Sequence, residues 1–394
     1  MRNRFTTRAH RLMVIVLAGA KDAKHAARAP GVLAAAAALL AGGAAIAAPG
    51  CGGSDDGGGG GAGDPVLAGA QPPAKGGAPT QDASERNFAL KTMDFGESER
   101  WKKLGYNIDG KISTSASVDV CKPTASGDRS VHNNGDSGID NSFGQKIVPF
   151  LGQLAPITTS VTQAIADGAF TVMIDVTGLT DDAKQTATGA SGKIFAGGAF
   201  DPDDAGLRPT FTTSDDWPVR PELLSSPSDA KSSTIAFHDA YVSGGTWVNG
   251  SGSSDVRLSL TLAGSTLSIT VHHAIITFNH TAPGHAANGV VAGVIGTQEL
   301  VASVGQVAGS LNSSLCDPVT AASLAKTLEG ASDILSDGTQ DPAKTCDGIS
   351  IGLGFTAEQI APPSKVAPPA AAAAAACAAP AADAGPPDAA DGGR

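Results

Sequence analysis

Aromatic and basic residues are both scarce in this chain. Aromatics make up 4% of its 394 residues, so a core must be assembled mainly from Val, Ile, Leu and Ala. The formal net charge is −11, and because residues 1–50 carry +6, the remainder carries −17. An acidic body of this kind repels phosphate backbones, which argues against nucleic acid as a partner.

Signatures of catalysis are missing as well. The chain has no Gly-x-Ser-x-Gly elbow, no His-Glu-x-x-His, no P-loop and no dinucleotide fingerprint. Its scattered Asp and Glu residues leave a glycosidase pair open, because the sequence does not show which carboxylates meet in space. We therefore expect a non-enzymatic protein, with a secreted hydrolase of envelope glycans as the alternative.

The first 50 residues have the organisation of an export signal. Seven basic residues precede the apolar stretch GVLAAAAALLAGGAAIAA, which leads into AAPGC. Small residues before a cysteine and a Gly-rich spacer after it resemble a bacterial lipoprotein processing site, with Cys51 as the lipidated residue. This predicts a membrane partner through a lipid anchor, in the bacterial cell envelope, at the outer membrane or surface. Soluble secretion and an uncleaved anchor are the alternatives, and Met1 and Met13 are both candidate starts.

Low-complexity sequence flanks the part of the chain that can fold. Residues 51–89 are rich in Gly and Pro and predict a flexible tether, whose first 33 residues after Cys51 would reach roughly 30 Å. Residues 361–394 are rich in Ala and Pro and predict a disordered tail. We expect one β-rich domain over 90–360.

A period of two dominates that domain. In AFTVMIDVTG, at 169–178, apolar residues alternate with mostly polar ones. VRLSLTLAGSTLSITV, at 256–271, predicts a hairpin with Gly264-Ser265 as its turn and Leu260 opposite Ile269. Alternation of this kind means one buried and one solvated face, which is typical of antiparallel sheet.

Helical patterns interrupt the strands. We expect a helix over 156–168, a helical hairpin from 300–311 and 317–335, and a closing strand at GISIGLGF, 348–355. The sequence therefore predicts a mainly β fold, an antiparallel β-sandwich or jelly-roll-like domain with helical insertions.

Two tryptophans are candidates for sugar binding. Trp217 lies in an acidic loop beside an arginine, and Trp247 lies opposite Val242 in a second predicted hairpin. An exposed indole beside carboxylates can stack on a sugar ring while its neighbours bind the hydroxyls. The alternative is that Trp217 anchors its loop to the core.

The loop NNGDSGIDNSFG, at 133–144, is a candidate calcium site. Asn134, Asp136, Asp140 and Asn141 would supply side-chain oxygens, and Gly would allow the tight turn that calcium loops need. The spacing is not that of an EF-hand. The alternative is a set of Asx turns in which these oxygens bind the backbone.

Cysteines and histidines add two further expectations. Export places the chain in an oxidising compartment, and Cys316 and Cys346 bracket the predicted second helix, so we expect them to form a disulfide that leaves Cys121 without a partner in the folded unit. The four histidines between His272 and His285 are interpreted as strand and loop residues rather than as a metal site.

Three short segments carry a family resemblance. GYNIDG at 105–110, DSGIDNSFG at 136–144 and CDGISIGLGF at 346–355 resemble segments of uncharacterised secreted lipoproteins from myxobacteria-type genomes. The similarity covers roughly 95–360. It implies export and a surface location, and it brings no known activity. Together with the composition it leads us to expect a monomer with a binding or structural role toward a polysaccharide or an envelope protein.

Overall fold

The computed structural model describes one unit that starts well before residue 90. It describes residues 70–124, 130–153, 156–201, 203–204, 206–250, 255–262 and 265–369. The predicted signal peptide, Cys51 and the first part of the tether lie outside these ranges, as does most of the predicted tail. Of the helices in the described ranges, none is both long and apolar enough to cross a membrane.

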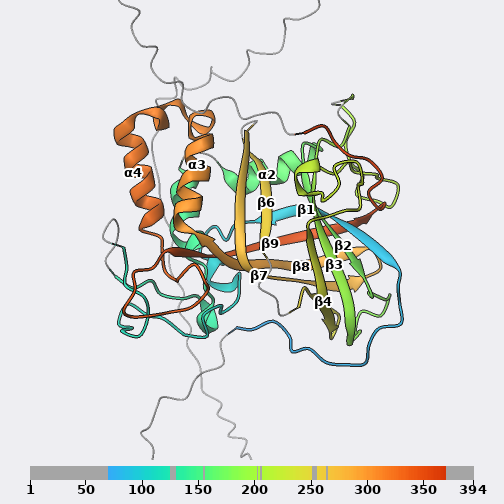
Figure 1. Cartoon of the computed structure of the whole chain (residues 1–394), viewed down its shortest axis with the longest axis horizontal. Helices are drawn as coiled ribbons and strands as arrows, with labels where there is room; N and C mark the ends of the chain where they lie inside the picture. Colours follow the sequence, from blue (N-terminus) through green and yellow to red (C-terminus); the bar gives the residue numbers. More distant parts are fainter. Residues whose placement is uncertain are drawn as a thin grey trace, which may run out of the picture. The chain divides into compact units, whose positions relative to one another are not determined.

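The fold is mainly antiparallel β, as predicted, but the sheet is closed (Figure 1). Eight strands follow one another in the order β5-β4-β3-β2-β1-β9-β8-β7, and β5 also pairs with β7, which completes a barrel. The sandwich or jelly-roll is therefore replaced by one sheet that closes on itself through β5 and β7, with a ninth strand, β6 (Val256–Leu262), paired to β7. The barrel strands are β1 (Glu85–Asp94), β2 (Thr171–Thr177), β3 (Ala187–Gly197), β4 (Ile235–Ser243), β5 (Thr246–Val248), β7 (Ser265–Ala282), β8 (His285–Gly296) and β9 (Gly348–Ile360).

The alternation of β9 explains its central place between β1 and β8. Four large apolar residues at alternate positions belong to the main core and are each at most 4% exposed: Ile349, Ile351, Leu353 and Phe355. The residues between them, Ser350, Gly352 and Gly354, are small. Successive side chains of a strand point to opposite faces. These large residues of β9 therefore fill the barrel, and the outer face carries small residues between them.

Both faces of β2 are buried, which corrects the expectation of a solvated face. Val172 and Ile174 belong to the main core, whereas Met173 joins a second, outer cluster. Trp217 and Val219 close this cluster from the loop between β3 and β4. The loop adds a layer outside the barrel, so alternation no longer separates buried from solvated positions.

The hairpin of β6 (Val256–Leu262) and the first half of β7 is present with a shifted register. Leu260 pairs with Leu267 rather than with Ile269, and Leu262 pairs with Ser265. The shift is two residues, which keeps every side chain on its predicted face. The second predicted hairpin is confirmed, with Val242 opposite Trp247.

The helices follow the predicted apolar stripes, except that the second helix of the hairpin ends at Glu329 rather than at the predicted residue 335. In α2 (Ile157–Ala166) the three stripe residues are buried, and α3 (Thr297–Leu311) and α4 (Pro318–Glu329) form the helical hairpin, with α3 against β7. Asp317 caps α4 by accepting from the backbone N–H groups of Val319 and Thr320.

Both predicted boundaries of the domain are too narrow. β1 already begins at Glu85, and Pro79 forms a bridge with Thr188 of β3. At the other end Val366 pairs with Val219. These segments bury main chain against the barrel, so they are part of the folded unit rather than of the tether and tail.

Candidate functional site

The three segments that carried the family resemblance meet in space. We call this the three-segment junction, formed by residues 104–110, 139–144 and 346–354. Asn141 Nδ2 donates to the carbonyl oxygens of Leu104 (2.9 Å) and Gly352 (3.0 Å), and so joins all three segments. Ser142 N donates to Ser350 Oγ at 2.9 Å. The motif residues therefore bind one another across more than 200 residues of sequence.

Glycine is required where the junction lies on β9. A Cβ atom on Gly352 would sit 2.1 Å from the carbonyl oxygen of Leu104. Gly105, next to Leu104, has a φ of 130°, which lies in the region that favours glycine. The glycines of these motifs thus allow the backbone of β9 to approach the backbone at Leu104 closely.

Asp140 holds the first of the three segments in place. It is 2% exposed, and its Oδ2 accepts from the backbone N–H of Ile108 at 2.7 Å and, more weakly, from that of Asp109. Its Oδ1 accepts from Asn134 Nδ2. Burial, with the charges of Asp109 and Asp333, raises the pKa of Asp140 well above its usual range.

Asp333 and Asp109 extend this polar network. Asp333 accepts from the backbone N–H and the hydroxyl of Ser350, at 2.8 Å and 2.5 Å. Gln340 Nε2 donates to Asp109 Oδ2 at 2.7 Å. Burial raises the pKa of Asp333 to about 7 and also raises the pKa of Asp109. Three desolvated carboxyl groups therefore share one region without a basic residue hydrogen-bonded to Asp140 or Asp333 in the described structure.

The geometry of the predicted calcium ligands favours the turn interpretation. Asn134 Oδ1 accepts from Ser113 N, Asn141 Oδ1 accepts from Gly144 N, and both Asp140 oxygens accept as described above. Asp136 is exposed in a short turn, η2 (Asp136–Gly138). Among the residues that the structure describes, no group of three or more His, Cys, Asp or Glu side chains is placed to hold a metal ion. Calcium binding by this loop stays a prediction.

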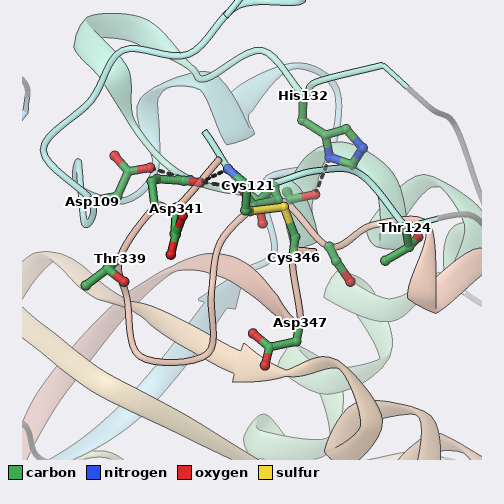
Figure 2. The surroundings of a disulfide bond; sticks show 12 residues. Asp109, Cys121, Thr124, His132, Thr339, Asp341, Cys346 and Asp347 are labelled. Atoms are coloured by element: carbon green, nitrogen blue, oxygen red, sulfur yellow. Dashed lines mark hydrogen bonds between the residues drawn. A yellow bond between two sulfur atoms is a disulfide. The ribbon is translucent and has the colours of Figure 1, made fainter. Parts of the chain in front are cut away.

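The predicted disulfide is wrong in one of its two cysteines. Cys346 pairs with Cys121, with Cα atoms 5.2 Å apart, and Figure 2 shows Asp109 to one side of this bond and His132 to the other. Lys122 and Thr345 form a parallel bridge that brings the two cysteines together. Cys316 lies in η5 (Ser313–Cys316), before α4, and takes no part in this bond.

Neither predicted sugar-binding tryptophan is exposed. Trp217 is 0% exposed in the outer cluster and donates through Nε1 to the carbonyl oxygen of Gly198 at 2.8 Å. Trp247 is 0% exposed inside the barrel and stacks on Phe278 at 5.2 Å. The alternative, that Trp217 anchors its loop to the core, is the arrangement observed.

A cleft of about 630 Å³ lies next to the junction and takes one wall from the predicted loop. Its other wall is the turn and short helix η1 (Arg100–Lys103) that follow β1. We call it the η1–η3 cleft. It is lined by Gly96, Ser98, Glu99, Trp101, Lys102, Asn133, Asn134, Gly144, Gln145, Lys146 and Pro149.

Unusual backbone forms both walls of the η1–η3 cleft. Ser98 and Glu99 have positive φ angles of 54° and 70°, which non-glycine residues adopt rarely and at a cost. Opposite them, η3 (Phe143–Ile147) is one turn of π-helix, a form that often occurs at functional sites. A Cβ atom on Gly144 would lie 2.7 Å from Cβ of Trp101, so the two walls touch at this glycine.

The lining of the cleft is suited to hydrogen bonding. Lys102 and Lys146 bring ammonium groups, and Asn133 and Gln145 bring side-chain amides. Asn133 accepts from Ser115 N through Oδ1, while its Nδ2 has no partner in the described structure. Glu99 is the one carboxylate of the lining, and it is ion-paired with Lys102. Such groups can bind hydroxyls, amides and anions.

Trp101 was missed as a site residue. It lies in GESERWKKLG, where charged residues surround a single indole, and that pattern is itself a signal for an aromatic side chain near the surface. Trp101 is 7% exposed, and the ammonium of Lys102 lies 5.6 Å from its ring centroid.

Carboxyl groups with raised pKa values lie away from the η1–η3 cleft. Asp175, on the outer face of β2, is 3% exposed, and burial with the neighbouring Glu85 raises its pKa to about 7. Asp109 and Asp140 belong to the junction, Asp333 binds it through Ser350, and none of the four lines the cleft. Perturbed carboxyls mark candidate catalytic sites only where a substrate can reach them.

In the described residues, the four histidines between His272 and His285 form no group of three metal-ligating side chains. His272 lies between Asp255 (2.9 Å) and Glu299 (3.0 Å), and His285 pairs with Glu358 at 3.1 Å. His280 is 1% exposed, and burial lowers its pKa. All four histidines from His272 to His285 lie on strands β7 and β8, which corrects the expectation that some of them are loop residues.

Comparison with known proteins gives no relative: no protein-family model, curated protein or solved structure matches the chain.

Proposed function

We propose that this chain is a lipid-anchored protein of the bacterial cell envelope with a non-enzymatic binding role, and that its ligand, an envelope polysaccharide or protein, binds in the η1–η3 cleft. The observation that carries the proposal is the lining of this cleft, which combines amides, two lysines and an indole. The AAPGC sequence and the resemblance to secreted lipoproteins support the anchor at Cys51.

The number of carboxylates in the lining of the cleft favours binding over glycan hydrolysis. A glycosidase places two carboxyl groups roughly 5–10 Å apart on either side of the scissile bond. In the described lining Glu99 stands alone, and its partner is an ammonium group. A hydrolase would need a second acid in reach of the same ligand.

The binding proposal is tested with the full chain, a panel of polysaccharides and a solubilised envelope extract. Trp101 should report binding by a change in its fluorescence, because it lines the cleft whereas Trp217 and Trp247 are fully buried elsewhere. Lys102→Gln should weaken binding, and the matched control is Lys103→Gln, since Lys103 is exposed and does not line the cleft. Equal binding by both variants, or release of reducing sugar by the wild type, would overturn the proposal.

The anchor is tested separately by intact-mass analysis of membrane-extracted protein. We expect a chain that begins at an acylated Cys51 and that moves to the soluble fraction in Cys51→Ser. Cleavage elsewhere, or an unmodified Cys51, would contradict the anchor and leave the cleft proposal standing.

A further inference from the structure

A second, smaller cavity lies on the polar face of the β6–β7 hairpin. Its volume is about 150 Å³, and its lining residues are Ala196, Arg220, Glu222, Leu223, Arg257, Ser259, Thr266 and Ser268. This cavity and the η1–η3 cleft share no lining residue. We call it the Arg220–Arg257 pocket.

Strand alternation places the polar side chains of the hairpin on the face that lines the pocket. Leu258 and Leu260 are buried on one face, which leaves Arg257 and Ser259 on the opposite face. Ser259 pairs directly with Ser268 across the two strands, so their hydroxyls lie side by side.

The second wall is fixed to the barrel by its backbone. Arg220 N donates to the carbonyl oxygen of Ala196 in β3 at 2.7 Å, and η4 (Pro221–Leu223) follows directly. Leu223 is 4% exposed and belongs to the main core, which anchors this segment. Arg220 therefore reaches the pocket from a rigid base.

The two arginines of the pocket differ from the other arginines that the structure describes. Arg86, Arg100 and Arg208 are each ion-paired with an aspartate. The guanidinium groups of Arg220 and Arg257 make no ion pair or hydrogen bond within the described part of the chain. Arg257 is exposed and Arg220 is half-buried, so both guanidinium groups are accessible to a ligand at this cavity.

We propose that the Arg220–Arg257 pocket binds a small tetrahedral oxyanion, a phosphate group either free or at the end of an ester. Guanidinium groups present pairs of N–H donors whose spacing matches two oxygens of such an anion. Ser259, Thr266 and Ser268 add hydroxyl donors for the remaining oxygens. The volume of about 150 Å³ is large enough for a single phosphate group. Glu222 is the one carboxylate of the lining and opposes the anion.

The proposal is tested by calorimetric titration of the full chain with inorganic phosphate, at an ionic strength held constant with sodium chloride. We expect saturable binding that Arg220→Gln and Arg257→Gln each weaken roughly tenfold or more, because each removes charge-assisted hydrogen bonds. Glu222→Gln should strengthen binding, since it removes the opposing charge. Arg208→Gln is the matched control: it removes the same charge outside the pocket and should leave the affinity unchanged.

Further arms identify the source of the phosphate group. Glycerol phosphate replaces inorganic phosphate in one titration, and vesicles with phosphatidate are compared with phosphatidylcholine vesicles in a sedimentation assay. Binding in any arm that the two pocket variants lose and Arg208→Gln retains supports the pocket. An affinity that is the same in wild type and both pocket variants, or no saturable binding in all arms, overturns it. Melting curves without phosphate confirm that the variants are folded.

Discussion

The barrel interior and the three-segment junction are both buried, yet different forces hold them. Inside the barrel, apolar side chains pack on one another, as where Phe278 lies 5.5 Å from Phe88 and 5.2 Å from Trp247. At the junction, Asp140 and Asn141 bind backbone groups of distant segments. A disulfide then fastens the junction's outer loops.

This difference decides how each region responds to change. Hydrophobic burial is non-directional and roughly proportional to the apolar area buried. The stability of the barrel therefore depends on whether all of its strands are present and on the volume of the side chains that fill it. A buried polar network depends on each donor, each acceptor and the charge of each carboxyl. The barrel should therefore be sensitive to deletion, and the junction to redox state, pH and single polar substitutions.

The largest expected effect comes from cutting the chain at the predicted domain boundary. A protein truncated to residues 90–360 loses Glu85–Ala89, which pair with both β2 and β9, and loses the fully buried Phe88. We expect no cooperative unfolding transition, because the barrel cannot close. The matched protein 70–369 should unfold cooperatively by circular dichroism. A sharp transition in the shorter chain would show that the barrel tolerates an open seam.

Removal of the disulfide should act on the junction first. In Cys121→Ser/Cys346→Ser we expect the free energy of unfolding to fall by roughly 2–5 kcal/mol, since a bond across 225 residues restricts the unfolded chain strongly. Hydrogen exchange should rise in residues 104–124 and 331–347 before it rises in β9. Peptide mapping without reduction checks the pairing, and a Cys316–Cys346 peptide would contradict it.

Stability should decrease as pH rises, in a way that depends on Asp333. Its pKa is raised to about 7, so the folded state holds this proton more tightly than the unfolded chain does. The contribution is therefore complete at about pH 4 and is lost as pH rises through 7, by roughly 2–4 kcal/mol. Asp333→Asn should flatten this part of the curve in urea unfolding at several pH values.

The control for the pH effect is Asp337→Asn, because the pKa of Asp337 is lowered by hydrogen bonds to Thr339 rather than raised. A group whose pKa is lowered in the folded state contributes stability at pH values above its pKa in the unfolded chain. Its effect on stability as pH rises therefore has the opposite sign to that of Asp333. An unchanged wild-type slope in Asp333→Asn would contradict the role of Asp333.

The smallest effects concern Asp140 and calcium. Asp140→Ala should destabilise by about 1–3 kcal/mol, since it leaves the half-buried N–H of Ile108 without its acceptor, whereas substitution of the exposed Asp136 by Ala should change little. We expect the wild-type melting midpoint to be equal in EDTA and in millimolar calcium, because the loop's oxygens already accept hydrogen bonds. A rise in calcium that Asp140→Asn abolishes would establish the metal site.

Several elements followed from local sequence because local physics determines them. The apolar stripe of α2, the Asp317 cap of α4 and the pairing of Val242 with Trp247 all depend on residues that are neighbours in the chain. The hairpin at β6 shows the limit of such reasoning. A two-residue slip keeps the same faces, so alternation cannot distinguish the two registers.

The sequence by itself determined that the chain is mainly β and that it carries helical insertions, whereas its few aromatic residues turned out to supply the largest buried side chains of the core. Only the tertiary structure decided that the sheet closes through β5 and β7, that Trp217 is covered, and that Cys346 meets Cys121. It also brought Trp101 to the wall of a cleft and Arg220 to Arg257. The physical reason is that contacts between segments far apart in the chain depend on how whole strands pack, which no local pattern of residues records.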